Sequence, residues 1–328
     1  MKLKPWIAVI AALGCTAAQA ADSIQLNKYV VTGTYALDPL NGTGAGISGL
    51  EASAVTYARD RGTLFFVGDE GRGVVEISRT GQTIGNNLFN WAGTGSTNND
   101  TEALTYLGNG RLVVGEERLQ NAYSFDYVAN ATVNLASTPF VSFGPTIGNV
   151  GIEGISYDPR NGGFVTVKQD NPAQLRIFNS LPFATAAAAD LVPNIAFSGT
   201  SALFGLNSLS DVQTLAPVDA LLGTAAADNL LVLSLDSRKL IEIDRLGNIK
   251  SMLDLSGVVP FNAIEGVTID ENGVIYLIAE QDQRTGAPAN SRSQLIVLTA
   301  VPEPETYAMM LAGLGLLGFV AARRRQTS

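Results

Sequence analysis

The stretch Ile152-Glu153-Gly154-Ile155-Ser156-Tyr157-Asp158-Pro159, continued by Asn161-Gly162-Gly163 and Phe164-Val165-Thr166-Val167-Lys168-Gln169-Asp170, decides the fold of this chain. It predicts a strand that begins at a glutamate, a turn, and a second strand that ends in polar residues. The pattern returns at Glu51, Glu102 and Glu265, and more loosely at Asp211, at intervals of 51, 51, 58 and 54 residues. A near-constant spacing of this size is typical of repeat architectures.

Each repeat contains three clear strand patterns and a weaker fourth, as in the four-stranded blade of a β-propeller. Turns such as Asn109-Gly110 and Asn272-Gly273, flanked by apolar residues, are typical of tight hairpins. Five repeats therefore predict an all-β, five-bladed β-propeller. The last repeat ends after its third strand, and the strand pattern at residues 27–37 has no local partner, so we expect this N-terminal strand to complete the last blade. Six blades, or a β-sandwich, are the alternatives.

Composition narrows the possible functions. The 328 residues include 34 Gly and only 16% charged residues, with a formal charge of −9. Without the basic and acidic residues of the two end segments described below, 16 basic and 28 acidic residues remain. Such a surface repels nucleic acid and attracts cations. The chain contains no His, which excludes a Ser-His-Asp triad, a histidine general base and most zinc sites.

The N-terminus has the features of a secretory signal peptide over residues 1–20. Lys2 and Lys4 form a basic start, residues 6–14 are apolar, and Ala18-Gln19-Ala20 is a small-residue site for signal peptidase. The alternative is lipidation at Cys15, the only cysteine. If Cys15 leaves with the signal peptide, the exported protein has no disulfide and depends on its core for stability.

The C-terminus, residues 301–328, resembles the PEP-CTERM sorting signal. Pro302-Glu303-Pro304 is followed by an apolar run at residues 307–322 and by Arg323-Arg324-Arg325. The resemblance implies processing by an exosortase, with release outside the cell or display on its surface. A 16-residue helix is about 24 Å long, which is short for a permanent membrane span, and the arginines would keep the end of a transient anchor in the cytoplasm. A simple tail anchor is the alternative.

Between these signals, residues 21–300 are predicted to form the propeller, with the repeated acids gathered at one mouth of its channel. The midpoints between the acids of the two strands lie in the predicted turns. In each repeat the end of the second strand is therefore expected beside the start of the first strand. We therefore expect two rings of carboxylates at this mouth, with Glu70, Glu116 and Asp282 beside them and Asp236 joining from the fourth repeat. The first ring contains Glu51, Glu102, Glu153, Asp211 and Glu265, and the second contains Asp69, Glu117, Asp170 and Glu280.

Carboxylates this close together repel one another strongly, so some must be protonated or a cation must lie among them. With neither His nor Cys available, every ligand is a hard oxygen, which favours Ca²⁺ over transition metals, and over Mg²⁺ if many protein ligands take part. The alternative is that each glutamate caps exposed backbone amides without a metal. Lys168 and Arg118 could neutralise part of the ring.

The repeats also resemble the SdiA-regulated family over residues 28–299. The resemblance rests on Ser48-Gly49-Leu50-Glu51, on residues 109–118, on the stretch quoted first and on Ala263-Ile264-Glu265-Gly266-Val267. It implies a five-bladed propeller with a bound calcium ion and no established activity. The first repeat, with Glu51, and the fourth, with Asp211 and a long insertion, depart from the family's pattern at two of the expected calcium ligands.

Two functions follow from these observations. The first is an exported calcium-binding propeller with a binding or structural role in the envelope or matrix, where its partner would be an exopolysaccharide or a surface protein. The second is a calcium-dependent hydrolase of an ester, lactone or phosphoester, with Glu153 or Glu265 as general base. Only Lys168, Arg118 and Arg72 are placed to bind phosphate, which argues against phytase activity.

Overall fold

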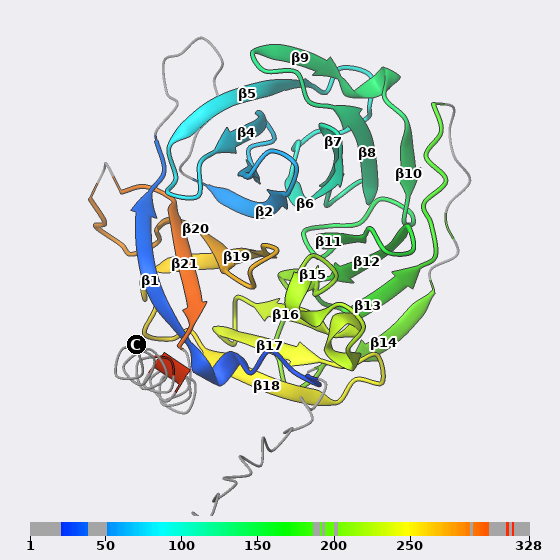
Figure 1. Ribbon diagram of the computed structural model, residues 1–328. Coiled ribbons are helices and arrows are strands. Elements are labelled where there is room, and N and C mark those ends of the chain that lie inside the picture. The colour runs from blue at the N-terminus through cyan, green and yellow to red at the C-terminus, as the bar shows by residue number, and fades with distance from the viewer. Residues whose placement is uncertain are drawn as a thin grey trace, which may run out of the picture.

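The strands of this computed structural model form five sheets around a central axis (Figure 1). The structure describes residues 21–38, 51–185, 191, 194–199, 203–288 and 291–301, with residues 313, 314 and 317. Within these residues the helices of the propeller are short 3₁₀ turns. The prediction of five blades with four strands each is confirmed.

One strand between the third and fourth strands of blade 2 belongs to blade 1. This strand, β9 (Ala131–Asn134), pairs in parallel with the outer strand of blade 1. The chain then returns to complete blade 2. Blade 1 contains β2 (Ala52–Ala58), β3 (Thr63–Gly68), β4 (Gly73–Ile77), β5 (Thr83–Asn90) and the added β9 (Ala131–Asn134). Blade 2 contains β6 (Thr101–Gly108), β7 (Arg111–Glu116), β8 (Asn121–Asp126) and β10 (Phe140–Ser142).

In blades 3 and 4 the strands are arranged in chain order from the axis outwards. Blade 3 contains β11 (Ile152–Asp158), β12 (Gly163–Lys168), β13 (Ala173–Phe178) and β14 (Ile195–Gly199). Blade 4 contains β15 (Asp211–Thr214), β16 (Leu230–Ser234), β17 (Lys239–Ile243) and β18 (Ile249–Asp254). The long insertion predicted in the fourth repeat forms two 3₁₀ turns, Asp219–Leu221 and Ala225–Asp228.

Blade 5 closes the ring as predicted. Its first three strands are β19 (Asn262–Ile269), β20 (Ile275–Asp282) and β21 (Gln294–Ala300), and its fourth is the N-terminal β1 (Tyr29–Ala36). Strand β1 pairs antiparallel with β21, so Tyr29 lies opposite Ala300. The N–H of Val301 donates to the carbonyl of Lys28 at 2.9 Å and extends this pairing by one residue.

The core lies between the blades. Five clusters of buried hydrophobic side chains each join two neighbouring blades, such as the one that packs Leu233 of blade 4 against Leu277 of blade 5. The innermost strands are also tied by hydroxyl groups. The N–H of Tyr106 donates to Thr56 Oγ1, the N–H of Tyr157 to Thr105 Oγ1, and the N–H of Thr214 to Ser156 Oγ.

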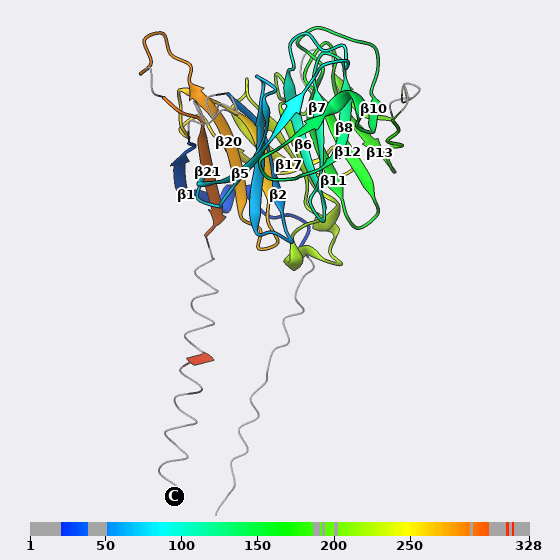
Figure 2. The same ribbon diagram turned by 90° about the horizontal axis from the view of Figure 1, so that it is seen from above.

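These antiparallel pairings give the propeller two distinct faces. The starts of the innermost strands lie on the same face as the connection between β20 and β21, which is at the top of Figure 2. The ends of the innermost strands lie on the opposite face, where β21 also ends. The described residues include no helix that is long and apolar enough to cross a membrane. The predicted C-terminal span lies outside them, apart from 313, 314 and 317.

Candidate metal centre

Three of the repeated glutamates occupy the same local structure, a β-bulge near the start of the innermost strand. The pairing register shifts between Thr101 and Ala103, between Ile152 and Gly154, and between Ile264 and Gly266. The extra residues are therefore Glu102, Glu153 and Glu265. A bulge redirects the side chain of its extra residue away from the regular pleat. The charges of Glu153 and Glu265 both raise the pKa of Glu102, and the charge of Glu265 raises that of Glu153, as expected for side chains near a common axis.

The structure corrects the alignment of the first and fourth repeats. The hydroxyl links between blades make Tyr57, Tyr106, Tyr157 and Thr214 equivalent. The bulge glutamate Glu102 lies four residues before Tyr106, and the same count from Tyr57 and Thr214 leads to Ser53 and Ser210. Relative to this bulge position, Glu51 lies two residues earlier in its repeat and Asp211 one residue later. The register shift between Ala52 and Ala54 agrees for the first repeat. The equivalent ring therefore contains three glutamates and two serines.

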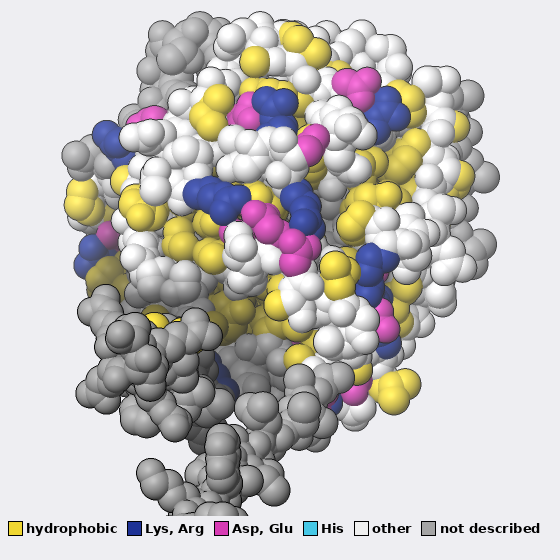
Figure 3. All heavy atoms as spheres, in the orientation of Figure 1, with side chains coloured by type: hydrophobic (Ala, Val, Ile, Leu, Met, Phe, Trp, Pro, Cys, Tyr) yellow, Lys and Arg dark blue, Asp and Glu magenta, His cyan; other side chains and the backbone are white. Residues whose placement is uncertain are grey.

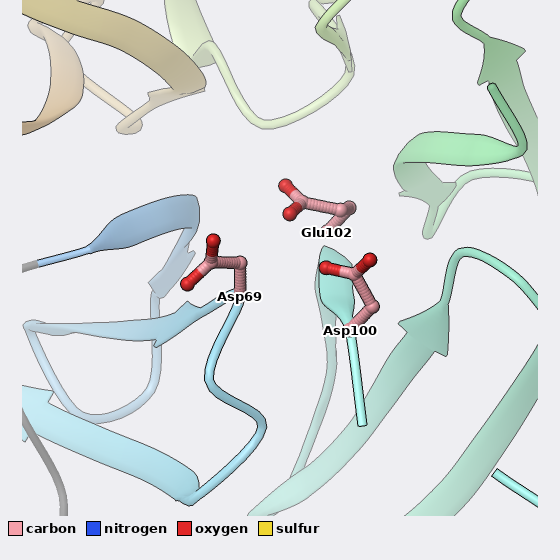
Figure 4. Close-up of side chains that lie close together, drawn as sticks. All are labelled: Asp69, Asp100 and Glu102. Carbon is pink, nitrogen blue, oxygen red and sulfur yellow. The ribbon is translucent and has the colours of Figure 1, made fainter. Parts of the chain in front are cut away.

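The best-defined group of potential ligands lies between blades 1 and 2. Asp69 follows β3, Asp100 precedes β6, and Glu102 lies within β6. One carboxylate oxygen from each of these residues lies within 4.8 Å of the other two. Figure 4 shows the three side chains converging on one space. Two of them, Asp69 and Glu102, belong to the predicted rings.

Asp100 was not predicted from the sequence. It is the structural equivalent of Glu51, because the N–H of Glu117 donates to the Asp100 carbonyl at 2.8 Å and the N–H of Asp69 donates to the Glu51 carbonyl at 3.2 Å. Glu51 and Asp100 each lie two residues before the bulge position of their repeat, at Ser53 and Glu102. This spacing is the sequence signal that could have identified Asp100. Arg118 Nε donates to Asp100 Oδ2 at 2.6 Å, which leaves Oδ1 for another partner.

The cluster carries strong mutual repulsion. Burial, and then the charge and hydrogen bonding of Glu51, raise the pKa of Asp69 from 3.8 to about 8. Burial, followed by the charges of Glu153 and Glu265, raises the pKa of Glu102 well above its usual value. These shifts mean that the ionised form of each carboxyl is disfavoured where it stands, unless a cation compensates the charge.

The second predicted ring is present in part. Burial raises the pKa of Glu117, while hydrogen bonds from Glu153 and from the N–H of Gly151, at 2.9 Å, oppose this shift. Burial also raises the pKa of Glu280, which lies beside Glu265. Asp170 instead accepts a hydrogen bond from the N–H of Asn171 in its own turn. Lys168 donates to the backbone carbonyl of Asp170 and not to a carboxylate of the ring.

The fourth repeat contributes no carboxylate to the described cluster. Asp211 is buried, and its two oxygens accept backbone hydrogen bonds from Val212 and Val267, both at 2.7 Å. It therefore links blade 4 to blade 5. Asp236 is exposed in the turn after β16, and its N–H donates to Ser208 Oγ. Amide capping, the alternative predicted for the repeated acids, is thus the arrangement seen at Asp211 and at one oxygen of Glu117.

The residues at this mouth suit a hard divalent cation. Oδ1 of Asp69 is buried and has no hydrogen-bond donor among the described residues. Two oxygens on opposite sides of Ca²⁺ are about 4.6–5.2 Å apart, since each Ca–O bond is about 2.3–2.6 Å long, and the spacing within the cluster is compatible with this geometry. A cation held by Asp69, Asp100 and Glu102 would relieve the repulsion and supply the missing partner of Asp69.

Comparisons with known proteins found two family models that match this chain and two solved structures that resemble it. The model of the SdiA-regulated family matches residues 31–283, and that of the PEP-CTERM protein-sorting motif matches residues 300–325. Glutaminyl cyclase from Myxococcus xanthus is similar in structure, with a TM-score of 0.50 and 12% identity over 84% of this chain and 97% of that chain. The β-propeller domain of Myceliophteria thermophila Cps50 (Swd1) gives a TM-score of 0.37 and 12% identity over 75% of this chain and 70% of that chain. At this identity the likeness to the cyclase concerns the fold alone.

Proposed function

Because this chain belongs to the SdiA-regulated family and carries a PEP-CTERM sorting motif, we propose that it is an exported, calcium-binding propeller with a binding or structural role outside the cell. The sorting motif indicates export and handling by an exosortase. Release or surface display after processing, and a polysaccharide or surface protein as the external partner, belong to the proposal.

The cluster of Asp69, Asp100 and Glu102 carries the calcium assignment. Their oxygens converge, the pKa of Asp69 is raised to about 8 by burial and by Glu51, and one buried oxygen of Asp69 has no partner in the described chain. Glu265, Glu153 and Glu51 are candidates for further ligands, since the charges of the first two act on Glu102 and that of Glu51 acts on Asp69. Such a cation would fix blades 1 and 2 relative to each other, because its ligands come from both.

Calorimetry tests the assignment. Adding Ca²⁺ to the metal-free purified protein should raise its melting temperature and give a binding isotherm, and EDTA should reverse both effects. Asp69→Asn, Asp100→Asn and Glu102→Gln should each weaken Ca²⁺ binding at least 10-fold. Asp236→Asn is the matched control, since this exposed carboxylate lies outside the cluster on the same face. A melting temperature that is indifferent to both Ca²⁺ and EDTA would exclude the proposed site.

A hydrolytic role at the same mouth is the second candidate. Its supporting observation is that burial raises the pKa of both Glu153 and Glu265 well above the usual value, with Glu117 and Glu280 adding to the respective shifts. A carboxyl with a raised pKa is a stronger base once it is ionised, which suits a general base. A bound Ca²⁺ would polarise a substrate oxygen. Glu153 or Glu265 would then take a proton from the attacking water.

The two candidates differ in a turnover assay. A panel of aryl esters, lactones and phosphodiesters, assayed with Ca²⁺ present, should show no turnover if the protein only binds. If a substrate is found, Glu153→Gln or Glu265→Gln should reduce its kcat at least 100-fold. Turnover that both variants retain would place the chemistry on other residues.

A further inference from the structure

A cavity of about 530 Å³ opens at the other end of the channel, on the face opposite the carboxylate cluster. All five innermost strands contribute to its lining, with Tyr57 from β2, Tyr106 from β6, Tyr157 from β11, Gln213 from β15 and Ile269 from β19. Because every inner strand takes part, the cavity lies on the propeller axis. Its volume is within the range of about 300–1,000 Å³ that is typical of small-molecule sites.

The aromatic walls of this cavity are held rigidly. The Tyr106 hydroxyl accepts a hydrogen bond from the N–H of Gly110 at 2.7 Å, and Arg79 donates to the Tyr57 hydroxyl. Tyr57 and Tyr106 are buried, with Arg79 over the ring of Tyr57 and the ring of Tyr106 stacked on Phe65. Tyr157 is half-buried and packs against Phe164 with 5.1 Å between ring centroids, so it is the most accessible of the three rings. A ring that is fixed in this way provides an apolar surface without the entropic cost of ordering it when a ligand binds.

The charged groups beside the cavity are of both signs. Arg59 Nη2 lies 2.8 Å from Asp219 Oδ2, and Asp60 Oδ2 accepts a hydrogen bond from the N–H of Asn109 at 3.0 Å. Figure 3 shows this face, where acidic and basic side chains lie side by side near the centre, among hydrophobic ones. The opposite mouth, in contrast, gathers carboxylates. A neutral ligand suits the mixed face, since neither sign of charge predominates there.

The cavity is also lined by polar side chains, among them the hydroxyls of Thr56, Thr105 and Thr268. Asp60 and Asn109 are exposed at its rim, and Gln213 is buried at its floor. Carboxylate and amide groups of this kind can each form two hydrogen bonds to adjacent hydroxyls, while tyrosine rings pack against the C–H face of a sugar ring. We propose that this cavity binds a neutral saccharide of one or two rings, with a ring face against Tyr157 and its hydroxyls at Asp60 and Asn109.

This site is separate from the proposed cation site. Glu102 and Tyr106 lie four residues apart on β6, which is about 13 Å along an extended strand. Saccharide binding therefore does not depend on Ca²⁺ as a ligand. Loss of one binding activity without the other is measurable, so the saccharide proposal and the calcium proposal can fail independently.

Saturation-transfer NMR on the purified protein tests the proposal. The probes are methyl glycosides of glucose, galactose, mannose and N-acetylglucosamine, with cyclohexanol as an apolar probe and glucuronate as a charged one. At least one neutral glycoside should receive saturation and bind more strongly than both comparison probes. Tyr157→Ala should weaken that binding at least 10-fold. Asp60→Asn, a nearly isosteric change at the exposed rim that leaves the fold intact, should weaken it at least threefold.

The control variant is Asp236→Asn, an exposed carboxylate at the opposite mouth outside the cation cluster, which should leave glycoside affinity unchanged within twofold. The proposal is overturned if no glycoside receives saturation, or if cyclohexanol binds as well as the best glycoside, which would indicate a purely apolar pocket. Equal loss of binding in Asp236→Asn and Asp60→Asn would also overturn it, because binding would then not depend on the residues that line this cavity.

Discussion

Asp211 occupies the space that a side chain on Gly154 would need. A Cβ atom added to Gly154 would lie 2.5 Å from Asp211 Oδ1 and 2.7 Å from Asp211 Cα. The glycine therefore allows blade 3 to approach blade 4 closely enough for the buried carboxylate to reach the backbone of both blade 4 and blade 5. Asp211 therefore contacts three blades. At the equivalent position, one residue after the bulge, the other repeats have alanine or glycine.

This arrangement predicts that Asp211 is needed for stability and not for calcium. Asp211→Ala leaves the N–H groups of Val212 and Val267 without their acceptor, so the free energy of unfolding should fall by about 1–3 kcal/mol. Ca²⁺ affinity should stay within about twofold, because both oxygens are already engaged. Urea denaturation and calorimetry measure the two quantities. A 10-fold loss of Ca²⁺ affinity in a folded Asp211→Ala protein would return Asp211 to the ligand set.

Gly154→Ala should destabilise the protein even though it adds only one methyl group. The neighbours that it would meet are backbone atoms as well as the carboxylate, including Val212 N at 2.9 Å, so they cannot move aside cheaply. We expect a loss of about 1–3 kcal/mol in urea denaturation. Gly257→Ala is the matched control, since nothing lies within 4 Å of an added Cβ there. Similar effects of the two substitutions would contradict the close approach.

The N-terminal segment is attached to blade 4 as well as to blade 5. The N–H of Ile24 donates to Glu242 Oε1 at 3.1 Å, and Asn229 Nδ2 donates to the same oxygen at 2.7 Å. Ser23 and Ser251 donate their hydroxyls to Glu242 Oε2 at 2.6 and 2.7 Å. Glu242 is completely buried, and it secures the chain just before β1 closes the ring.

Glu242→Ala should therefore loosen the closure of the propeller. The change leaves several buried donors without an acceptor, and we expect a loss of about 2–4 kcal/mol in unfolding free energy. Amide exchange should accelerate first in residues 24–36, ahead of the strands of blades 2 and 3. Asp254→Asn, an exposed change in the neighbouring β18, serves as the control. Uniform acceleration across all blades would show that Glu242 supports the whole fold and not the closure.

The repeat period and the orphan strand sufficed to predict five blades and their closure, because blade architecture depends on strand pattern and turn residues that recur along the chain. The individual site residues were harder to predict. A β-bulge shifts the register by one residue without any mark in the hydrophobic pattern, so Ser53 and Ser210 were passed over in favour of nearby acids. Asp100 lies outside the strand pattern, and only the pairing of Glu117 with it reveals its equivalence to Glu51.

The raised pKa values give the metal-free protein an unusual pH dependence. A carboxyl whose pKa is higher in the folded than in the unfolded state binds more protons when folded, so stability falls as pH rises between the two values. For Asp69 this range runs from about 3.8 to about 8, and Glu102, Glu153 and Glu265 shift in the same direction. Burial acts to raise the pKa values of Glu76 and Asp158, but hydrogen bonds from Arg61 and Arg160 outweigh it and lower both values. These two groups therefore affect the stability only at more acidic pH.

The melting temperature of the metal-free protein should thus fall by several degrees between pH 5 and pH 8. With saturating Ca²⁺ the same scan should be flat or should rise, because the bound cation favours the ionised carboxylates and its affinity increases as protons leave. Differential scanning calorimetry at pH 5, 6, 7 and 8, with and without Ca²⁺, makes the comparison. Asp69→Asn should make the fall in the metal-free profile smaller, whereas Asp236→Asn should not. A metal-free melting temperature that rises from pH 5 to pH 8 would show that the carboxylates at this mouth are ionised and already compensated by other groups of the protein.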